Sequence, residues 1–394
     1  MTKSSKDRLP GTIDISPYPD GTWIIRNIRQ LSIKAYRIII GLLIHIGPIG
    51  RYRPPNGNFL AYRLLDEAQN KGKIVTASQQ PRSKNKDSIC DLAKLGQHAA
   101  EPWPIFWLRA SNASLIGDSL IWRNSKDQIC LEQCYGFELE MSIRNSKFIR
   151  NSFLENATLL NGSTTSLLTN WTQGTNYYHW IVDALPRISM LEYAPSDTRI
   201  IIPSAGAGFV DESMELLDLG DRCIKIESNH VICENFYFMS PTAQVGHWNP
   251  YAYSWLQNVF KKHFSKEIPN RRIFFTRRGN RRVPKNIRLI EKLFKKNGFD
   301  IIDCGAHPLL QQIQISSSAI CVAGIHGAAM TNLLWTPHGI PILEIFESNY
   351  LNACYENISI HNSSNYAYIF HDFVDAPQRI EAWISSVCQN QIHS

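Results

Sequence analysis

The sequence predicts an α/β protein made of two doubly wound halves, each built on a parallel sheet. The runs Ala319–Gly324 and Ile340–Phe346 are apolar throughout, too short for helices and without polar alternation, which is typical of central strands covered on both faces. Similar runs alternate with helical segments of about ten residues along the second half of the chain, a pattern that gives right-handed βαβ units. Charged and glycine-containing turns follow several of these strands, at the edge where doubly wound sheets hold ligands.

The expected elements follow one another closely from residue 171 onward. A glycine after a helical run, as at Gly220 and Gly298, marks a helix end, and the proline-rich passage Pro241–Pro250 is expected to connect the two halves. In chain order the predicted elements are the helix Tyr177–Tyr193, the strand Arg199–Pro203, the helix Asp211–Leu219, the strand Val231–Met239, the helix Ser254–Phe264, the strand Arg272–Thr276, the helix Asn286–Lys296, the strand Asp300–Asp303, the helix Pro308–Ser317, and the strands Ala319–Gly324 and Ile340–Phe346 with a turn and a short helix between them.

The first part of the chain has a different pattern of apolar and turn residues. From about residue 100 to 170, short apolar patches such as Ile105–Leu108 and Ser119–Trp122 alternate with turn residues, which favours β structure. We therefore predict three parts, namely a partly β N-terminal extension over residues 1–150, an N-terminal lobe over 151–248 and a C-terminal Rossmann-like lobe over 249–394.

Composition and charge narrow the class of ligand. The chain has 394 residues, 44% of them hydrophobic and 19% charged, which is ordinary for a globular protein long enough for two domains. The net charge is +7, and the excess is local, because eight Lys or Arg and no Asp or Glu lie between Arg271 and Arg288. Such a segment favours a small anionic ligand over nucleic acid, for which the sequence has no recognised motif. A basic nucleic-acid-binding module is kept only as a distant alternative.

Three features bear on the compartment. Nine cysteines are scattered without a Cys-x-x-Cys pair, which favours free thiols in a reducing compartment. The first thirty residues lack the apolar core of a signal peptide, and the apolar run Ile38–Gly50 has 13 residues, fewer than the roughly 20 that a spanning helix needs. That run is expected to be either a buried element or an interfacial anchor beside Arg37 and Arg51. We expect a cytoplasmic protein and leave peripheral association with the inner membrane face open.

The first segment whose residues could take part in catalysis is the predicted helix Tyr177–Tyr193. His179 and Asp183 are four residues apart and share one helix face, with Arg187 one turn further. A carboxylate can orient an imidazole and hold its pKa near the working pH, so the pair can act as a general base. A buried helix in which the two side chains merely pair is the alternative.

The second segment is an arginine-rich turn directly after a predicted strand. It places Arg277, Arg278 and Arg282 around Gly279, which allows the backbone to approach a ligand closely. The planar guanidinium group suits bidentate contact with phosphate. A solvated basic loop is the alternative.

The third segment follows the strand that ends at Gly324. Amides of Gly327 and Ala328 at a helix N-terminus would favour an anion, and His326 could donate to a phosphate. Asn332 follows in the short helix, and Glu344 in the next strand could accept hydrogen bonds from ribose hydroxyls. A buried, satisfied histidine is the alternative. The sequence has no Asp-x-Asp for a metal-bridged diphosphate, so no metal site is predicted.

Together the three segments make the chain similar to glycosyltransferase family 61, the group with the DUF563 domain. The resemblance runs from about Trp171 to Phe346 and rests on the ordered trio of Asn-Tyr-Tyr-His-Trp with Asp and Leu-Pro-Arg, the arginine turn, and His-Gly-Ala with Thr-Asn-Leu, Pro and Glu. The family contains bacterial capsular-polysaccharide biosynthesis proteins, plant xylosyl- and arabinosyltransferases and animal O-GlcNAc transferases. It implies an inverting, GT-B-like enzyme, with two Rossmann-like lobes facing across a cleft, that uses a nucleotide sugar, usually a UDP-sugar.

One departure from the family pattern keeps an alternative open. Relatives tend to show Arg-x-x-Asn-Glu after the arginine turn, whereas here Asn286 is followed by Ile287, so the acidic residue is missing. A catalytically inactive relative that binds a nucleotide sugar or a polysaccharide is therefore the alternative to an enzyme.

The resemblance assigns the site residues by position. His179 and Asp183 are expected to deprotonate the acceptor hydroxyl. The residues expected to hold the nucleotide sugar are Arg277, Arg278, Arg282, Asn286, His326, Gly327, Ala328, Asn332 and Glu344. The expected reaction moves a sugar from a nucleotide diphosphate sugar to a saccharide acceptor in surface or capsular polysaccharide synthesis, with no metal or other cofactor.

Overall fold

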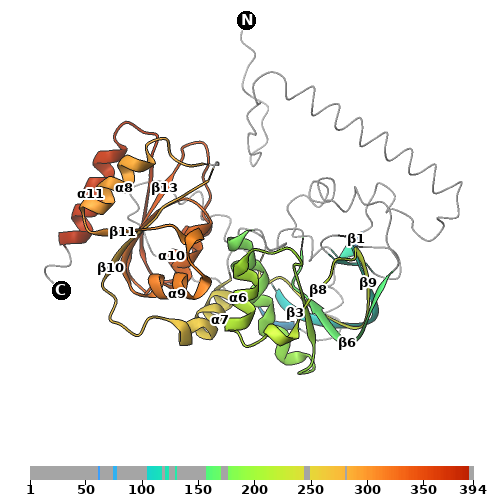
Figure 1. Cartoon of the computed structure of the whole chain (residues 1–394). Coiled ribbons are helices and arrows are strands. Elements are labelled where there is room, and N and C mark those ends of the chain that lie inside the picture. The colour runs from blue at the N-terminus through green and yellow to red at the C-terminus, as the bar shows by residue number, and fades with distance from the viewer. Residues whose placement is uncertain are drawn as a thin grey trace, which may run out of the picture. The chain divides into compact units, whose positions relative to one another are not determined.

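The computed structural model describes residues 61–62, 74–77, 104–117, 120–123, 129–130, 157–169, 176–243, 249–279 and 282–389. Within these residues the chain forms two β-sheets flanked by helices (Figure 1), which confirms the expected mixed α/β class. The run Ile38–Gly50 lies outside the described residues. In the part that is described, no helix is both long enough and apolar enough to span a membrane.

The first sheet contains nine strands and is mixed. Its order is β1-β5-β4-β3-β9-β6-β7-β8, with β2 on β3, and its strands are β1 (Ala61–Tyr62), β2 (Ile74–Ala77), β3 (Pro104–Ile116), β4 (Ile121–Arg123), β5 (Ile129–Cys130), β6 (Thr158–Ser166), β7 (Arg199–Ile202), β8 (Cys223–Lys225) and β9 (His230–Met239). Strands β9, β6, β7 and β8 are parallel to one another, but β9 also pairs antiparallel with the long strand β3. The first half is therefore not the all-parallel sheet that we expected.

Strand β3 explains this difference. Its 13 residues alternate buried side chains with more exposed ones, as at Leu108, Arg109, Ala113 and Ser114, and such alternation is typical of an antiparallel strand with one wetter face. The predicted β structure before residue 170 thus belongs to the same sheet as β9. The bounds 1–150, 151–248 and 249–394 stay predictions.

The second sheet has five strands, all parallel, in the order β11-β10-β12-β13-β14. The strands are β10 (Arg271–Phe275), β11 (Phe299–Ile302), β12 (Ala319–Ile325), β13 (Pro341–Phe346) and β14 (Asn365–Phe370). The chain first moves outward from β10 to β11 and then returns past β10 to β12. Parallel doubly wound sheets bind ligands where the strand order reverses in this way, at the carboxyl ends of the two strands involved.

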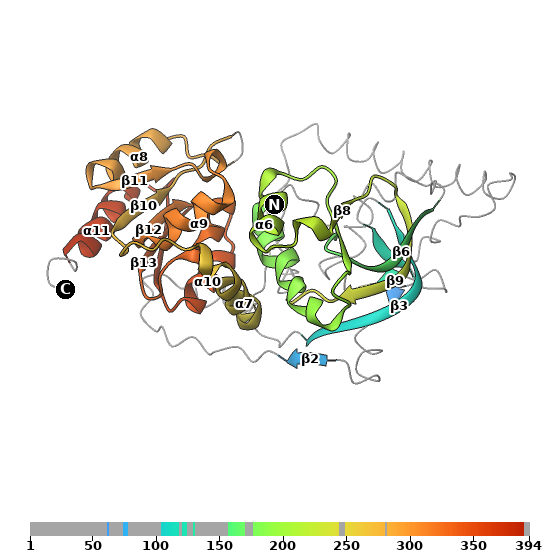
Figure 2. The ribbon, with the colours of Figure 1, turned by 60° about the horizontal axis from the view of Figure 1, so that its bottom comes forward.

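Helices cover both faces of the second sheet (Figures 1 and 2). Helices α8 (Ile287–Lys296) and α11 (Ala376–Gln389) contact each other on one face, where Phe274, Phe294 and Ile380 belong to one buried cluster. Helices α9 (Leu309–Ser317) and α10 (Cys354–His361) lie on the other face with the 3₁₀ helix η8 (Ala328–Trp335). Because both faces are covered, the strands read as continuous apolar runs.

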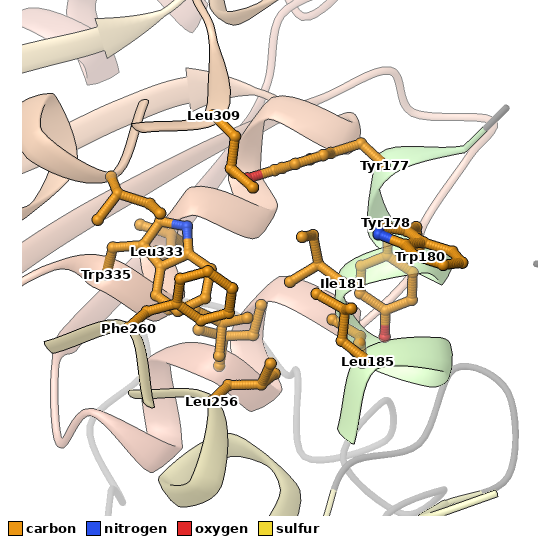
Figure 3. Close-up of a cluster of buried hydrophobic side chains, with 14 of the residues drawn as sticks. Tyr177, Tyr178, Trp180, Ile181, Leu185, Leu256, Phe260, Leu309, Leu333 and Trp335 are labelled. Carbon is orange, nitrogen blue, oxygen red and sulfur yellow. The ribbon is translucent and has the colours of Figure 1, made fainter. Parts of the chain in front are cut away.

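A second buried cluster contains residues from both halves of the chain. It includes Ile181 and Leu185 of the predicted helix Tyr177–Tyr193 together with Phe260 and Trp335, and Figure 3 draws these side chains. Helix α7 (Pro250–Phe260) and helix α6 (Gly208–Leu216) also contribute to it. Burial of a large apolar side chain stabilises a fold by about 1.5–3 kcal/mol, so this shared core fixes the helix that carries His179 against the elements around η8.

The predicted helix Tyr177–Tyr193 forms, but not as a regular α-helix. Residues His179–Ala184 form a π-helix (η3) and Leu185–Tyr193 a 3₁₀ helix (η4). Pro186 accounts for the change, because its ring clashes with the carbonyl four residues earlier and it has no N–H to donate. The wider turn before it, in which the Leu185 N–H bonds to the Trp180 carbonyl, avoids this clash.

The remaining predicted elements appear within a few residues of their expected bounds, with one larger shift. Helix α7 begins at Pro250 instead of Ser254, because the Asn249 side chain accepts a hydrogen bond from the Tyr251 amide and Pro250 occupies the first helical position. The prediction stopped at Phe346, so α10, β14 and α11 were not expected.

Candidate active site

The second and third predicted segments meet at the point where the strand order of the second sheet reverses. Strand β10 leads into Arg277 and its neighbour β12 leads into His326, with Phe275 paired to Gly324 just before both turns. The sequence alone could place each segment at a strand end, and the pairing of β10 with β12 brings them together.

Arg277 is bonded to the backbone of the His326 turn. Its Nη1 donates a hydrogen bond to the His326 carbonyl oxygen at 2.6 Å. Burial, with the nearby charge of Arg282, lowers the pKa of Arg277, but an arginine remains charged at neutral pH. A fixed positive charge therefore lies at the carboxyl end of both strands.

Gly327 makes the bond between Arg277 and the His326 carbonyl possible because it has no side chain. A Cβ atom at Gly327 would lie 2.0 Å from Nη1 of Arg277, far inside van der Waals contact. Its backbone φ of 161° is extended and open to any residue, so the requirement for glycine is steric. Gly327 thus has a close neighbour in Arg277, and the approach of a ligand to Gly279 stays a prediction.

His326 is buried and held by acidic and aromatic side chains. Its Nδ1 bonds to Oε1 of Glu344, and Oε2 of Glu344 accepts a hydrogen bond from the Tyr366 hydroxyl at 2.6 Å. The imidazole stacks on Phe346, with ring centroids 4.7 Å apart. Burial, with the charge of Glu344, raises the pKa of Tyr366 well above its usual range, so that hydroxyl remains a donor.

Glu344 is engaged inside the protein, and its expected contact with ribose stays a prediction. Its side chain is fully buried, and both oxygens already accept hydrogen bonds inside the protein. A carboxylate in this position cannot reach ribose hydroxyls without leaving its partners. We assign it to orienting His326.

Arg278 and Arg282 point to different neighbours. Arg278 forms an ion pair with Glu291 of α8 and also donates to the Thr276 hydroxyl at 2.9 Å, so its charge is already balanced. Arg282 lies over the ring of Tyr350, 4.3 Å from the centroid, and both line a shallow pocket with His326. Of the two, Arg282 is the better placed to join Arg277 at a ligand.

The position after Asn286 lacks the acidic residue of the family pattern, but a glutamate follows one helical turn later. Asn286 precedes α8 and makes no side-chain cap there, and its role with nucleotide stays a prediction. Glu291 lies four residues beyond Ile287, on the same helix face, and holds Arg278 and Thr276. The first turns of α8 thus still place a carboxylate beside the arginine turn.

Asn332 stabilises the packing of η8. It is fully buried, its Oδ1 accepts from the Tyr177 hydroxyl at 2.8 Å and its Nδ2 donates to Gln312 at 3.0 Å. Through these contacts it links the helix of His179 to the segment after His326, and its role with the nucleotide stays a prediction. The amides of Gly327 and Ala328 remain predicted anion ligands.

The first predicted segment forms the pair that its spacing indicates. Nδ1 of His179 lies 2.7 Å from Oδ2 of Asp183, and the Asp183 side chain is buried whereas that of His179 is 15% exposed. Burial raises the pKa of Asp183, and the hydrogen bond and charge of His179 oppose that rise. With Nδ1 donating to the carboxylate, Nε2 is the basic atom of the neutral ring. Arg187 does not join this pair, because it is buried and donates to the carbonyls of Met239 and Ser166.

A chain of aromatic rings connects the two histidines. The ring of Tyr178 lies 5.4 Å from that of His179 and 5.7 Å from that of Tyr355, which in turn lies 5.2 Å from His326. Tyr178 and Tyr355 are buried, and burial raises the pKa of both hydroxyls well above the usual range. All three predicted segments therefore belong to one neighbourhood. No sequence pattern indicated Tyr350, Tyr355 or Tyr366, which all lie beyond the last motif.

Other features lie apart from this neighbourhood. A cavity of about 650 Å³ is lined by Lys262, Arg271, His307 and Gln311 among others, at the edge where β10 begins. Among the described residues no group of three or more His, Cys, Asp or Glu side chains is arranged to hold a metal ion. The cysteines in the described ranges that are not in disulfides are Cys223, Cys233, Cys304, Cys321, Cys354 and Cys388.

Comparison with known families identifies the class of protein. Residues 177–343 match the profile of glycosyltransferase family 61, over the segment that contains His179, Arg277 and His326. This segment, somewhat less than half of the chain, is therefore a glycosyltransferase family 61 domain, and it supports a glycosyltransferase enzyme with a sugar donor and an acceptor as substrates. A comparison with curated proteins finds no match.

Proposed function

We propose that this glycosyltransferase is inverting and metal-independent and takes its sugar from a nucleotide diphosphate sugar, with UDP as the nucleotide. The acceptor is a saccharide in surface or capsular polysaccharide synthesis, in the cytoplasm at the inner face of the membrane. The proposal includes a GT-B arrangement of two Rossmann-like lobes. The observation that carries it is the bond between Arg277 and the His326 turn at the reversal of the strand order.

The donor diphosphate would lie against Arg277, Arg282 and His326. Departure of the nucleotide increases the negative charge on its terminal phosphate, and fixed cations stabilise that charge in the transition state. The carboxylate of Glu344 bonds to Nδ1 of His326 and so orients the ring, whose Nε2 would face a phosphate oxygen. This arrangement supplies without a metal the charge that a divalent ion supplies elsewhere.

The acceptor would be activated by His179. Its Nε2 accepts the proton of the acceptor hydroxyl, the acceptor oxygen forms a bond to the anomeric carbon, and the bond to the diphosphate breaks with its electron pair leaving on phosphate. A single displacement of this kind inverts the anomeric centre. Asp183 stabilises the imidazolium that results, because its carboxylate accepts the Nδ1 hydrogen.

The test is turnover with a defined product. The protein is incubated with nucleotide sugars and a panel of saccharide acceptors, UDP release is measured in EDTA and in magnesium, and NMR gives the anomeric configuration of the product. The proposal predicts turnover unaffected by EDTA and an anomer opposite to that of the donor. A product with retained configuration would contradict the single displacement, and loss of turnover in EDTA would contradict metal independence.

The alternative from the sequence was a relative that binds but does not transfer. Membership of the family and the intact His179–Asp183 pair favour the enzyme. Nucleotide binding without turnover on any acceptor would favour the binding protein instead.

A further inference from the structure

Exposed apolar side chains gather on two loops of the second sheet. Among the exposed large hydrophobic residues of the described chain, four lie directly after β13 and β14, and they are named here the apolar rim: Tyr350, Leu351, Phe373 and Val374. Val374 is 97% exposed. A contiguous apolar patch on a soluble surface marks an interaction site more often than scattered residues do.

The two loops leave the sheet side by side. Strands β13 and β14 are parallel neighbours, with Phe346 paired to Phe370 at their carboxyl ends. The loops are tied together, because the Ser348 amide donates to Oδ1 of Asp372 at 3.0 Å. The ring of Phe373 contacts that of Phe370 at 5.0 Å, which fixes the second loop on its strand. The apolar rim is therefore a built surface at the same edge as the candidate active site.

The apolar rim continues into the basic segment. Arg282 lies over the ring of Tyr350, so this cation of the segment borders the rim directly. The described cations there are Arg277, Arg282, Lys285 and Arg288, with Arg278 balanced by its ion pair with Glu291. The loops of the rim also carry Glu347 and Asp372, which offset part of this positive charge, and Asp375, which pairs with Arg379. The edge as a whole is basic beside an apolar projection.

We infer that the apolar rim and the basic segment dock this protein onto an anionic membrane surface. Apolar side chains that enter the headgroup layer gain hydrophobic free energy, and each nearby Lys or Arg is attracted to anionic lipid. Stable membrane association takes two such signals, and this edge has both. The inference deepens the peripheral association proposed above and assigns it to a surface other than the run Ile38–Gly50.

The position of this surface bears on the acceptor. Arg282 contacts Tyr350 of the rim and belongs to the proposed diphosphate site, so docking brings the candidate active site to the lipid surface. An acceptor saccharide carried on a lipid would then reach the site without leaving the bilayer. This consequence rests on the proposed function, whereas docking itself does not.

Vesicle co-sedimentation tests the inference. The full-length protein is mixed with vesicles of phosphatidylglycerol and phosphatidylcholine in equal parts, with pure phosphatidylcholine vesicles as reference. We expect binding to the anionic vesicles that weakens with salt, and a loss of about tenfold or more in partition coefficient for Val374→Asp. Val374 has almost no contact to lose, so this variant is expected to fold. Its UDP affinity should equal that of the parent, which separates failure of docking from failure of the proposed function.

Ile268 provides the matched control. It is 87% exposed and lies just before β10, at the opposite edge of the sheet from the apolar rim. Ile268→Asp makes the same kind of change and should leave vesicle binding unaltered. Equal binding of Val374→Asp and the parent, or equal loss in the two variants, would overturn the inference. A further measurement is light scattering in the absence of lipid. If it shows a dimer that Val374→Asp converts to a monomer, a second copy of the chain covers the rim and the inference is overturned.

Discussion

Gly327→Ala is the sharpest perturbation of the candidate site, because the structure gives its effect directly. The new methyl group would lie 2.0 Å from Nη1 and 3.2 Å from Cζ of Arg277. The guanidinium must move by more than about 1 Å to restore ordinary contact, and its 2.6 Å bond to the His326 carbonyl cannot survive that movement. The backbone at Gly327 is extended, so alanine adds no conformational strain.

The expected magnitude follows from the lost interaction. A hydrogen bond involving a charged group contributes about 1.5–3 kcal/mol, which corresponds to roughly a 10- to 150-fold loss in affinity for a ligand that needs Arg277 in place. Stability should change less, because Arg277 is only half-buried and its far end can turn to solvent.

Calorimetric titration with UDP, together with the melting temperature, measures both quantities. Gly305→Ala is the matched control, since a Cβ there would meet only Asp303 Oδ1 at 3.5 Å, an ordinary contact. In an Arg277→Ala background, Gly327→Ala should cause no further loss. Unchanged UDP affinity in Gly327→Ala, or additive losses in the double variant, would refute the reasoning.

Three further outcomes follow from the site. His179→Ala should leave UDP affinity within about twofold of the parent and lower transfer by about 10²- to 10⁴-fold, and a variant with normal turnover would remove His179 as the base. Tyr366→Phe removes one donor to buried Glu344 and should lower the free energy of unfolding by about 1–3 kcal/mol, with weaker UDP binding; denaturant titration and calorimetry check both, and no change in either would contradict the role given to Glu344. Burial, with the charge of Glu344, raises the pKa of Glu356 from 4.5 to about 7. The folded protein therefore keeps a proton that the unfolded chain releases, and the stability that this gives is present at acid pH and lost as the pH rises through about 7. Glu356→Gln should stabilise the protein relative to the parent at about pH 8, by up to about 2 kcal/mol, and much less at about pH 5; an equal effect at both pH values would contradict this.

The second sheet could be predicted from the sequence because its strands are buried on both faces. A short run such as Ala319–Gly324, apolar throughout, is stable as a central strand that is covered on both faces. The turn after such a run then lies at the carboxyl end of the strand. The same reasoning fails for the first sheet. Strand β3 joins it from more than a hundred residues before β9, and pairing over that distance leaves no local pattern to read.

The candidate site was predictable in its parts and not in its contacts. The spacing of His179 and Asp183 on a helix was sufficient to predict their bond, because residues four apart face each other. The bond from Arg277 to the His326 carbonyl depends on the order of β10 and β12, which the sequence does not specify. Glu344 was placed with ribose because acidic residues at strand ends commonly lie there, whereas Tyr366 from the unexpected strand β14 and His326 hold it inside the protein.

The central claim is that the edge formed by β10 and β12 holds the nucleotide. Its most direct test is a titration of the protein with UDP, GDP, CMP and ADP in EDTA, in which the melting temperature and the heat of binding are measured. A ligand that binds only the folded state raises the melting temperature. The account predicts stabilisation by UDP that magnesium does not increase and that Arg277→Ala strongly reduces, while Arg379→Ala, far along the chain in an exposed ion pair, leaves it intact. If none of the nucleotides stabilises the protein, or if Arg277→Ala binds UDP as the parent does, the edge formed by β10 and β12 is not the nucleotide site.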